Sequence, residues 1–202
     1  MVDSVFNSAL RCTSQAPYTF SRISDTLFIT FRGLVSKPKR HRLHSGVMVN
    51  KGYWEQLMAV EQNVRGILYE HPDARVIIFA GHSFGGAIAQ LAAAHFGLVL
   101  ERKYRIVCHT FGSPRVGNRQ FVKWFSDMVD EHVRVQNDLD PVPMTPIGPL
   151  WVHTCDMAWS LSKDMTGRIV RKDTPWYRRP LKILGSDPLE HDCKVYIERL
   201  ED

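Results

Sequence analysis

Ser83 lies in a five-residue pattern, Gly81-His82-Ser83-Phe84-Gly85, that is typical of a serine nucleophile. The apolar segment Val76–Ala80 precedes the pattern and a stretch without charged residues follows it, so a strand should lead into a sharp turn and then a helix. The flanking glycines leave room for the neighbouring backbone. Such a turn exposes the serine hydroxyl and places the Phe84 N–H at the helix start, where it can donate to a developing oxyanion. The pattern therefore predicts acyl transfer through Ser83.

A serine hydroxyl attacks efficiently only when a histidine takes its proton, and a carboxylate must orient that histidine. The chain has nine histidines. The serine pattern resembles that of the α/β-hydrolases, in which the acid and then the histidine follow the serine in the chain. This resemblance excludes four histidines as the base: His41, His44, His71 and His82. Three others fall within or at the start of predicted elements: His95, His109 and His132. Of the remaining two we favour His191, at a loop-to-helix boundary, over His153, in a short predicted strand.

Asp140 is the carboxylate that we favour as the orienting acid. It follows the predicted strand Val133–Gln136 and precedes Pro141, so it lies at the carboxyl end of a strand, where ligand crevices form in parallel sheets. Asp138 is the alternative, although a solvent-exposed loop position explains it more simply. The predicted catalytic residues are thus Ser83, Asp140 and His191.

The elements that must position these residues alternate between strands and helices. Short apolar segments predict strands at Leu27–Phe31, Arg75–Ala80, Arg105–Phe111 and Val133–Gln136. Helical periodicity predicts helices over Tyr53–Tyr69 and after the N-cap residue Asn118, and the uncharged stretch 84–100 reads as a buried core helix. Beyond Pro141 we expect short strands at Trp151–Thr154 and Ile169–Val170 and a final helix at Glu190–Leu200. This order predicts an α/β fold with a mostly parallel sheet and helices on both faces.

The composition is that of one globular domain spanning residues 1–202. Of the 202 residues 44% are hydrophobic, so the chain can bury a large core and is not compositionally disordered. The net charge of +5 does not by itself imply nucleic-acid binding. The first sixteen residues lack the apolar run of a secretory signal, which favours an intracellular location. Four cysteines lack the close pairs of zinc or redox motifs, so we expect free thiols and no metal, with two disulfide bridges as the alternative to free thiols: Cys12, Cys108, Cys155 and Cys193.

The chain resembles the class 3 lipases, the fungal triacylglycerol lipase-like branch of the α/β-hydrolases. The resemblance extends from about residue 27 to residue 200 and is most specific in the nine residues from Thr110 to Asn118. It also includes these segments: Phe31-Arg32-Gly33, His44-Ser45-Gly46, Gly81–Ala87, Asn137–Pro143, His153 and the segment around His191.

This resemblance implies an α/β-hydrolase fold and a cofactor-free serine ester hydrolase acting on acylglycerols or phospholipid-like esters. Asp140 matches the acid of the family, and the position of His153 is structural there. The second oxyanion donor, beside the N–H of Phe84, is the backbone N–H of Leu34. Relatives usually have Ser or Thr at that position, so we expect slower turnover with a leucine, which offers only its N–H. The alternative from another class is a catalytically idle lipase-like domain that senses lipid or binds a partner.

Two basic clusters lie in segments that should border the site. The first cluster lies within residues 34–45 and includes Lys37, Lys39, Arg40 and Arg42. The same segment has too few apolar side chains for an amphipathic lid helix, so we expect weak interfacial activation. The second cluster, within residues 171–182, includes Arg178 and Arg179. Solvent-exposed loops explain both clusters; the alternative is transient contact with an anionic membrane surface, to which each basic residue contributes on the order of 1 kcal/mol. The expected partners are a lipid or small ester substrate and no nucleic acid, and the oligomeric state stays open.

Overall fold

A mostly parallel β-sheet forms the centre of the computed structural model, which describes residues 16–32, 39–101, 103–155, 157–163, 169–175 and 186–201. In these residues the sheet has seven strands, in the order β1-β2-β5-β6-β7-β8-β9. The inner strands are parallel to one another, and β1 and β9 pair antiparallel at the two edges. The strands are β1 Tyr18–Ile23, β2 Thr26–Phe31, β5 Val76–His82, β6 Arg105–Phe111, β7 Glu131–Asn137, β8 Met157–Lys163 and β9 Ile169–Pro175.

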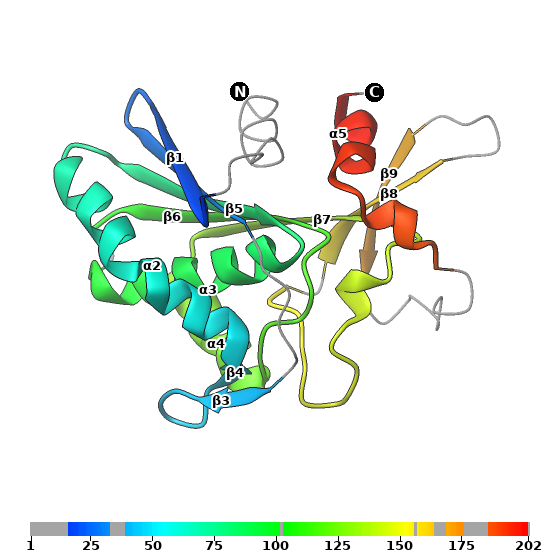
Figure 1. Cartoon of the computed structure of the whole chain (residues 1–202), viewed down its shortest axis with the longest axis horizontal. Helices are drawn as coiled ribbons and strands as arrows, with labels where there is room; N and C mark the ends of the chain where they lie inside the picture. The colour runs from blue at the N-terminus through cyan, green and yellow to red at the C-terminus, as the bar shows by residue number, and fades with distance from the viewer. Residues whose placement is uncertain are drawn as a thin grey trace.

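Helices cover both faces of this sheet (Figure 1). The helices α2 (Lys51–Glu70), α3 (Phe84–Val99) and α4 (Arg119–Met128) lie on one face, and α5 (Cys193–Glu201) lies on the other. Successive residues of β5 face opposite sides, because Phe79 belongs to the core with α2, α3 and α4, whereas Ala80 packs with Tyr196 of α5. The predicted α/β fold is confirmed, and burial on both faces explains the continuous apolar runs of the inner strands.

The uncharged helix α3 is buried on almost all sides. It contacts β2, β5 and β6 of the sheet as well as α2 and α4. Its small side chains, among them Ala89, Ala92 and Ala93, are fully buried and let these neighbours approach closely. The prediction of a core helix is therefore confirmed. None of the helices in the described residues is long and apolar enough to cross a membrane.

The elements predicted before Pro141 correspond to β2, α2, β5, α3, β6, α4 and β7, with ends that differ by a few residues. The later predictions are less accurate. The predicted strand Trp151–Thr154 is wrong, because only Val152 forms a bridge there, to Gly117, within a loop. The predicted final helix divides into a short 3-10 helix, η4 (Pro188–His191), and α5.

The sequence pattern did not predict four strands: β1, β8, β3 (Arg40–Arg42) and β4 (Met48–Asn50). The last two form a separate two-stranded sheet. β1 and β3 are largely exposed and rich in polar residues, so no apolar run marks them. β9 extends beyond the predicted Ile169–Val170 into charged residues, and the sequence pattern therefore predicts only its first two residues.

Asn118 ties the start of α4 to β4. Its side-chain oxygen accepts from the Phe121 N–H at 3.1 Å, which confirms the predicted N-cap. The same oxygen accepts from the Met48 N–H at 3.1 Å, and the side-chain nitrogen donates to the Gly46 carbonyl at 2.9 Å. One buried amide therefore satisfies backbone groups in two segments that are distant in the sequence.

We predict that Asn118→Ala lowers the free energy of unfolding by about 2 to 3 kcal/mol, because it removes a helix cap and leaves buried backbone N–H groups unsatisfied. Urea unfolding followed by circular dichroism measures this change. The variant Asn118→Asp keeps the acceptor for the Phe121 and Met48 N–H groups, adds a negative charge that the start of a helix favours, and loses the donor to Gly46, so it should be less destabilised than the alanine variant. Equal stability of wild type and Asn118→Ala would contradict the interpretation.

Candidate active site

Ser83 lies on a strained turn between β5 and α3. Its backbone has φ 57° and ψ −128°, and a positive φ is unfavourable for a residue with a side chain. The Ser83 N–H donates to the Phe111 carbonyl of the adjacent strand β6 at 2.8 Å, and the Ser83 carbonyl accepts from the Gly86 N–H at 3.0 Å. The turn is therefore held by the sheet on one side and by the first turn of α3 on the other.

The first glycine of the pattern, Gly81, is required by the close approach of the backbone across this turn. A Cβ added to Gly81 would lie 2.3 Å from the carbonyl carbon of Gly85, well inside any tolerated contact. The strand and helix can therefore meet at this angle only if residue 81 has no side chain. This is the steric reason for the spacing found in the sequence.

The structure brings Ser83, His191 and Asp140 into one chain of hydrogen bonds. The Nε2 atom of His191 lies 2.7 Å from the Ser83 Oγ, and its Nδ1 atom lies 2.8 Å from the Asp140 Oδ2. With the proton on Nδ1, the ring donates to the carboxylate and can accept the proton of the serine hydroxyl. His191 is the last residue of η4, so the predicted loop-to-helix boundary is where the structure places it.

Asp140 is buried, and each of its carboxylate oxygens is hydrogen-bonded. Oδ2 also accepts from the Tyr196 hydroxyl at 2.6 Å, and Oδ1 accepts from the Val142 N–H at 2.8 Å. The Tyr196 hydroxyl in turn accepts from the Asn137 N–H at 2.9 Å. These bonds offset the cost of removing the carboxylate from water and fix its direction toward His191. Sequence reasoning missed Tyr196, which the helical pattern marks only as an apolar residue of the last helix.

The segment that carries His191 is anchored to the loop after β7. The Asn137 side-chain nitrogen donates to the Glu190 carbonyl at 2.8 Å, and the Asp187 N–H donates to the Leu139 carbonyl at 3.0 Å. A second attachment links η4 to α5, because the Arg199 guanidinium lies 2.6 Å from the Glu190 carboxylate. The position of the imidazole is therefore set by contacts on both sides of it.

The alternative acid and base have other partners. The Asp138 carboxylate accepts from the Ser160 hydroxyl at 3.1 Å, so it is half-buried against β8 and is not the solvent-exposed loop residue that we expected. His153 is buried in a loop, where its Nε2 donates to the Pro143 carbonyl at 2.7 Å. Of the two histidine candidates, His191 is the one whose ring is hydrogen-bonded to Ser83.

His82 is a further member of the site that sequence reasoning did not identify, because chain order excluded it as the base. Its ring stacks on the His191 ring with centroids 4.7 Å apart and meets the Tyr196 ring edge-on at 5.3 Å. Burial, and to a smaller degree the neighbouring His191, lower the pKa of His82 to about 4, whereas Asp140 acts in the opposite direction. A neutral His82 ring therefore supports one face of the His191 imidazole at neutral pH.

The other predicted site residues are only partly covered by the structure. Phe84 is the first residue of α3, and its ring packs edge-on against Tyr53 at 5.2 Å. Lys39 and the β3 residues Arg40 and Arg42 are exposed. Four predicted contacts lie outside the described residues: Leu34, Lys37, Arg178 and Arg179.

No group of three or more metal-ligating side chains occurs within the ranges that the structure describes. Three of the four cysteines, Cys108, Cys155 and Cys193, are free thiols, as expected, and Cys12 lies outside those ranges.

A family model described as "Lipase (class 3)" matches residues 19–149. A "Secreted mono- and diacylglycerol lipase 1" from Fusarium solani is 32% identical over 133 residues, which is 61% of this chain and 39% of that protein. The chloroplastic "Phospholipase A(1) DAD1" from Arabidopsis thaliana is 28% identical over 144 residues, which is 66% of this chain and 32% of that protein. The chain thus spans less than half the length of either relative.

The fold is similar to that of solved lipase structures. The native lipase-propeptide complex from Rhizomucor miehei superimposes with a TM-score of 0.73 at 18% identity, over 94% of this chain and 77% of that chain. The lipase from Rhizopus microsporus var. chinensis gives a TM-score of 0.68 at 22% identity, over 88% and 66% of the two chains. The fold is therefore the α/β-hydrolase fold.

The low pKa of His82 predicts a specific loss of stability in acid. In the unfolded chain this histidine binds a proton near its ordinary pKa of 6.5, whereas in the folded chain it does so only near 4. Protonation of His82 therefore leaves the free energy of unfolding unchanged above pH 6.5 and lowers it as the pH falls from 6.5 to 4, by about 3 kcal/mol in total. We expect His82→Phe, which keeps a ring for stacking, to remove about this much of the pH dependence of the unfolding free energy measured in urea. If wild type and His82→Phe showed the same pH dependence of the unfolding free energy, the low pKa of His82 would be contradicted.

Proposed function

The chain belongs to the class 3 lipase family, and we propose that it is a serine carboxylic-ester hydrolase with Ser83, His191 and Asp140 as its catalytic triad. The observation that carries this proposal is the continuous chain of hydrogen bonds from the Ser83 Oγ through the His191 ring to the Asp140 carboxylate, at 2.7 Å and 2.8 Å. The order of the bonds matches the roles of nucleophile, base and orienting acid.

In the proposed first step, the Ser83 Oγ attacks the carbonyl carbon of the ester while the His191 Nε2 takes the hydroxyl proton. The resulting tetrahedral intermediate collapses when His191 gives that proton to the leaving alcohol, and an acyl-serine remains. Water then attacks the acyl carbon while His191 takes one of its protons. The bond from the acyl carbon to the Ser83 Oγ breaks as His191 gives that proton to the Oγ, and the carboxylic acid is released. Asp140 stays ionised and stabilises the imidazolium that forms in each step.

The negative charge on the former carbonyl oxygen needs hydrogen-bond donors near Ser83. We propose the N–H of Phe84 as one donor, because it opens α3, where unpaired N–H groups and the helix dipole favour an anion. The family resemblance supports the backbone N–H of Leu34 as the second donor. In subtilisin, losing one such donor costs about 2.7 to 4 kcal/mol of transition-state stabilisation, so a site with fewer donors should turn over more slowly.

Acylglycerols or phospholipid-like esters are the substrates that we propose. The relatives named mono- and diacylglycerol lipase and phospholipase A(1) support this substrate class. Leu139, beside Asp140, is 39% exposed, and Leu189, two residues before His191, is 75% exposed. Exposed leucines next to the acid and the base provide apolar surface that an acyl chain could contact.

We predict that a fluorophosphonate probe labels the wild-type chain and that Ser83→Ala abolishes labelling. The variant should also lose ester hydrolysis by about 10⁶-fold in kcat, because it removes the nucleophile. Labelling is read by intact mass, and hydrolysis is measured on short-chain esters, acylglycerols and phospholipids. The control variant Ser21→Ala, on the edge strand β1, should label like wild type. A folded wild-type chain that neither labels nor hydrolyses any of these esters would support the idle, lipid-sensing alternative instead.

We further propose that six basic residues contact anionic lipid: Lys37, Lys39, Arg40, Arg42, Arg178 and Arg179. Sedimentation with vesicles should show stronger binding to phosphatidylserine than to phosphatidylcholine, with each basic residue contributing on the order of 1 kcal/mol. Charge reversal of Lys39, Arg40 and Arg42 together should weaken the binding to anionic vesicles. Reversal of Arg75 and Lys103, which precede the first residues of β5 and β6, is the matched control. Equal binding to both vesicle types would remove the proposal.

A further inference from the structure

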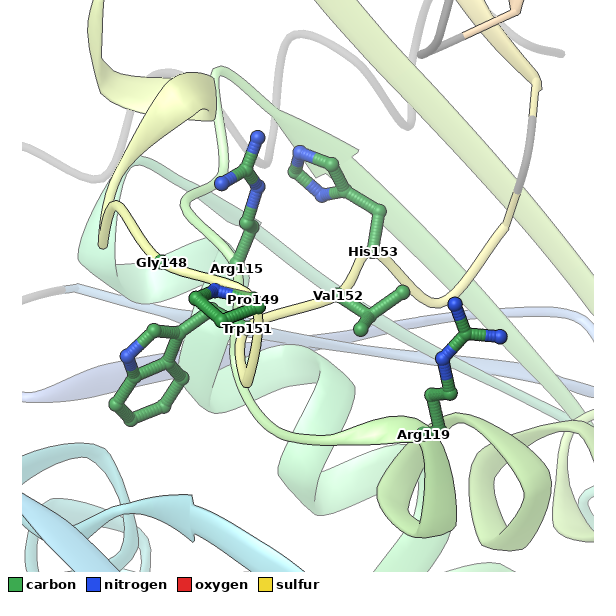
Figure 2. Close-up of a pocket in the computed structure, with 7 residues that line it drawn as sticks. All are labelled: Arg115, Arg119, Gly148, Pro149, Trp151, Val152 and His153. Atoms are coloured by element: carbon green, nitrogen blue, oxygen red, sulfur yellow. The ribbon is translucent and has the colours of Figure 1, made fainter.

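A pocket of about 270 Å³ lies between the segment that leads into α4 and the loop 148–153. Figure 2 shows Arg115 and Arg119 on opposite sides of Val152 and His153, with Trp151 and Pro149 along the loop. None of these residues belongs to the proposed triad. The pocket is therefore a separate feature of the molecule, and its chemistry is that of two guanidinium groups beside apolar walls.

The walls of the pocket are fixed by hydrogen bonds between the two segments. The Arg115 N–H donates to the Thr145 carbonyl at 2.7 Å, and the Val152 N–H donates to the Gly117 carbonyl at 2.9 Å. The far end of the loop is attached to α3, because the Thr154 hydroxyl donates to the Gln90 side-chain oxygen at 2.7 Å. A ligand would thus enter a site that is already formed, which lowers the entropic cost of binding.

The arginines of the pocket have no acidic counter-charge nearby in sequence. Neither Gly112–Ser126 nor Pro141–Cys155 contains an aspartate or a glutamate. Within the described residues, no carboxylate oxygen lies within 4.0 Å of the guanidinium nitrogens of Arg115 or Arg119.

Arg115 is half-buried, and burial lowers its pKa because the charged form is partly removed from water. The hydrogen bond that its guanidinium forms there is to the Pro146 carbonyl, at 3.2 Å. A guanidinium in this position attracts an anion, which would supply the missing charge and further hydrogen bonds.

The size and lining of the pocket limit the kind of anion. Pro149, Trp151 and Val152 form apolar walls, which suit a hydrocarbon chain better than a fully hydrated ion. The volume is slightly below the range of about 300 to 1,000 Å³ that is usual for drug-sized ligands. A short chain fits these limits, whereas a two-chain lipid does not.

We propose that this pocket binds a short-chain organic carboxylate, with the carboxylate at Arg115 and the chain against Trp151 and Val152. Arg115 is the main anchor, because its side chain is partly desolvated and held in place. Arg119, the exposed first residue of α4, adds a second positive charge at the other side. This inference does not depend on the proposed hydrolase activity, because it concerns binding at a different set of residues.

Isothermal titration of the full chain with octanoate tests the proposal. Octanoate should bind at least about tenfold more tightly than acetate, which lacks the chain, and than 1-octanol, which lacks the charge. Arg115→Gln should weaken octanoate binding by about tenfold or more, Arg119→Gln by a smaller factor, and Trp151→Ala should also weaken it. The matched control Arg75→Gln removes an exposed arginine just before β5 and should bind octanoate like wild type.

Two results would overturn the proposal. One is octanoate binding that is unchanged in Arg119→Gln and Trp151→Ala, which would locate any bound octanoate elsewhere, for example beside Ser83. The other is 1-octanol binding as tightly as octanoate, which would make the arginines irrelevant. Because Arg115 also bonds to the loop, circular dichroism must show that Arg115→Gln is folded, and the other two variants decide the question if it is not.

Discussion

The buried carboxylate of Asp140 is the group around which the C-terminal part of the chain is organised. A carboxylate without water is costly unless hydrogen bonds replace its hydration. Here the donors are the Val142 backbone, the Tyr196 hydroxyl and the His191 ring, which belong to the short 3-10 helix η1 (Val142–Met144), to α5 and to η4. Satisfying one carboxylate therefore fixes three separate segments against the end of the sheet.

The strained backbone of Ser83 is the second constraint, and the core supports it. The positive φ of this residue persists because hydrogen bonds from β6 and from the first turn of α3 hold both of its peptide groups. The helix α3 cannot relax away from the turn, since α2, α4 and the sheet surround it. The burial of α3 thus explains both why the helix has no charged residues and why the serine turn keeps its strained geometry.

The residues of the candidate site differ in how well the sequence predicts them, and the reasons are physical. The sharp turn at Ser83 could be predicted because a short local pattern, with a strand before it and a helix after it, determines its conformation. Asp140 and His191 could be ranked only by chain order and element boundaries, which restrict a position without fixing a distance. Tyr196 and His82 were beyond prediction, because their roles depend on which face of the sheet α5 covers.

The same distinction holds for the fold. Inner strands buried on both faces leave continuous apolar runs, and β2, β5, β6 and β7 were predicted from them. The exposed strand β1 carries no such signal. The loop around Val152 was mistaken for a strand because its apolar residues line a pocket and a bridge instead of a sheet.

The place of His191 and Tyr196 in the chain has a consequence for biosynthesis. A ribosome makes Ser83 and Asp140 long before it makes these two residues, and domains fold largely in the order of synthesis. A nascent chain that stops short of η4 (Pro188–His191) would contain Ser83 and Asp140 but not the base. Of the three residues of the proposed triad, the base is therefore the last to be made.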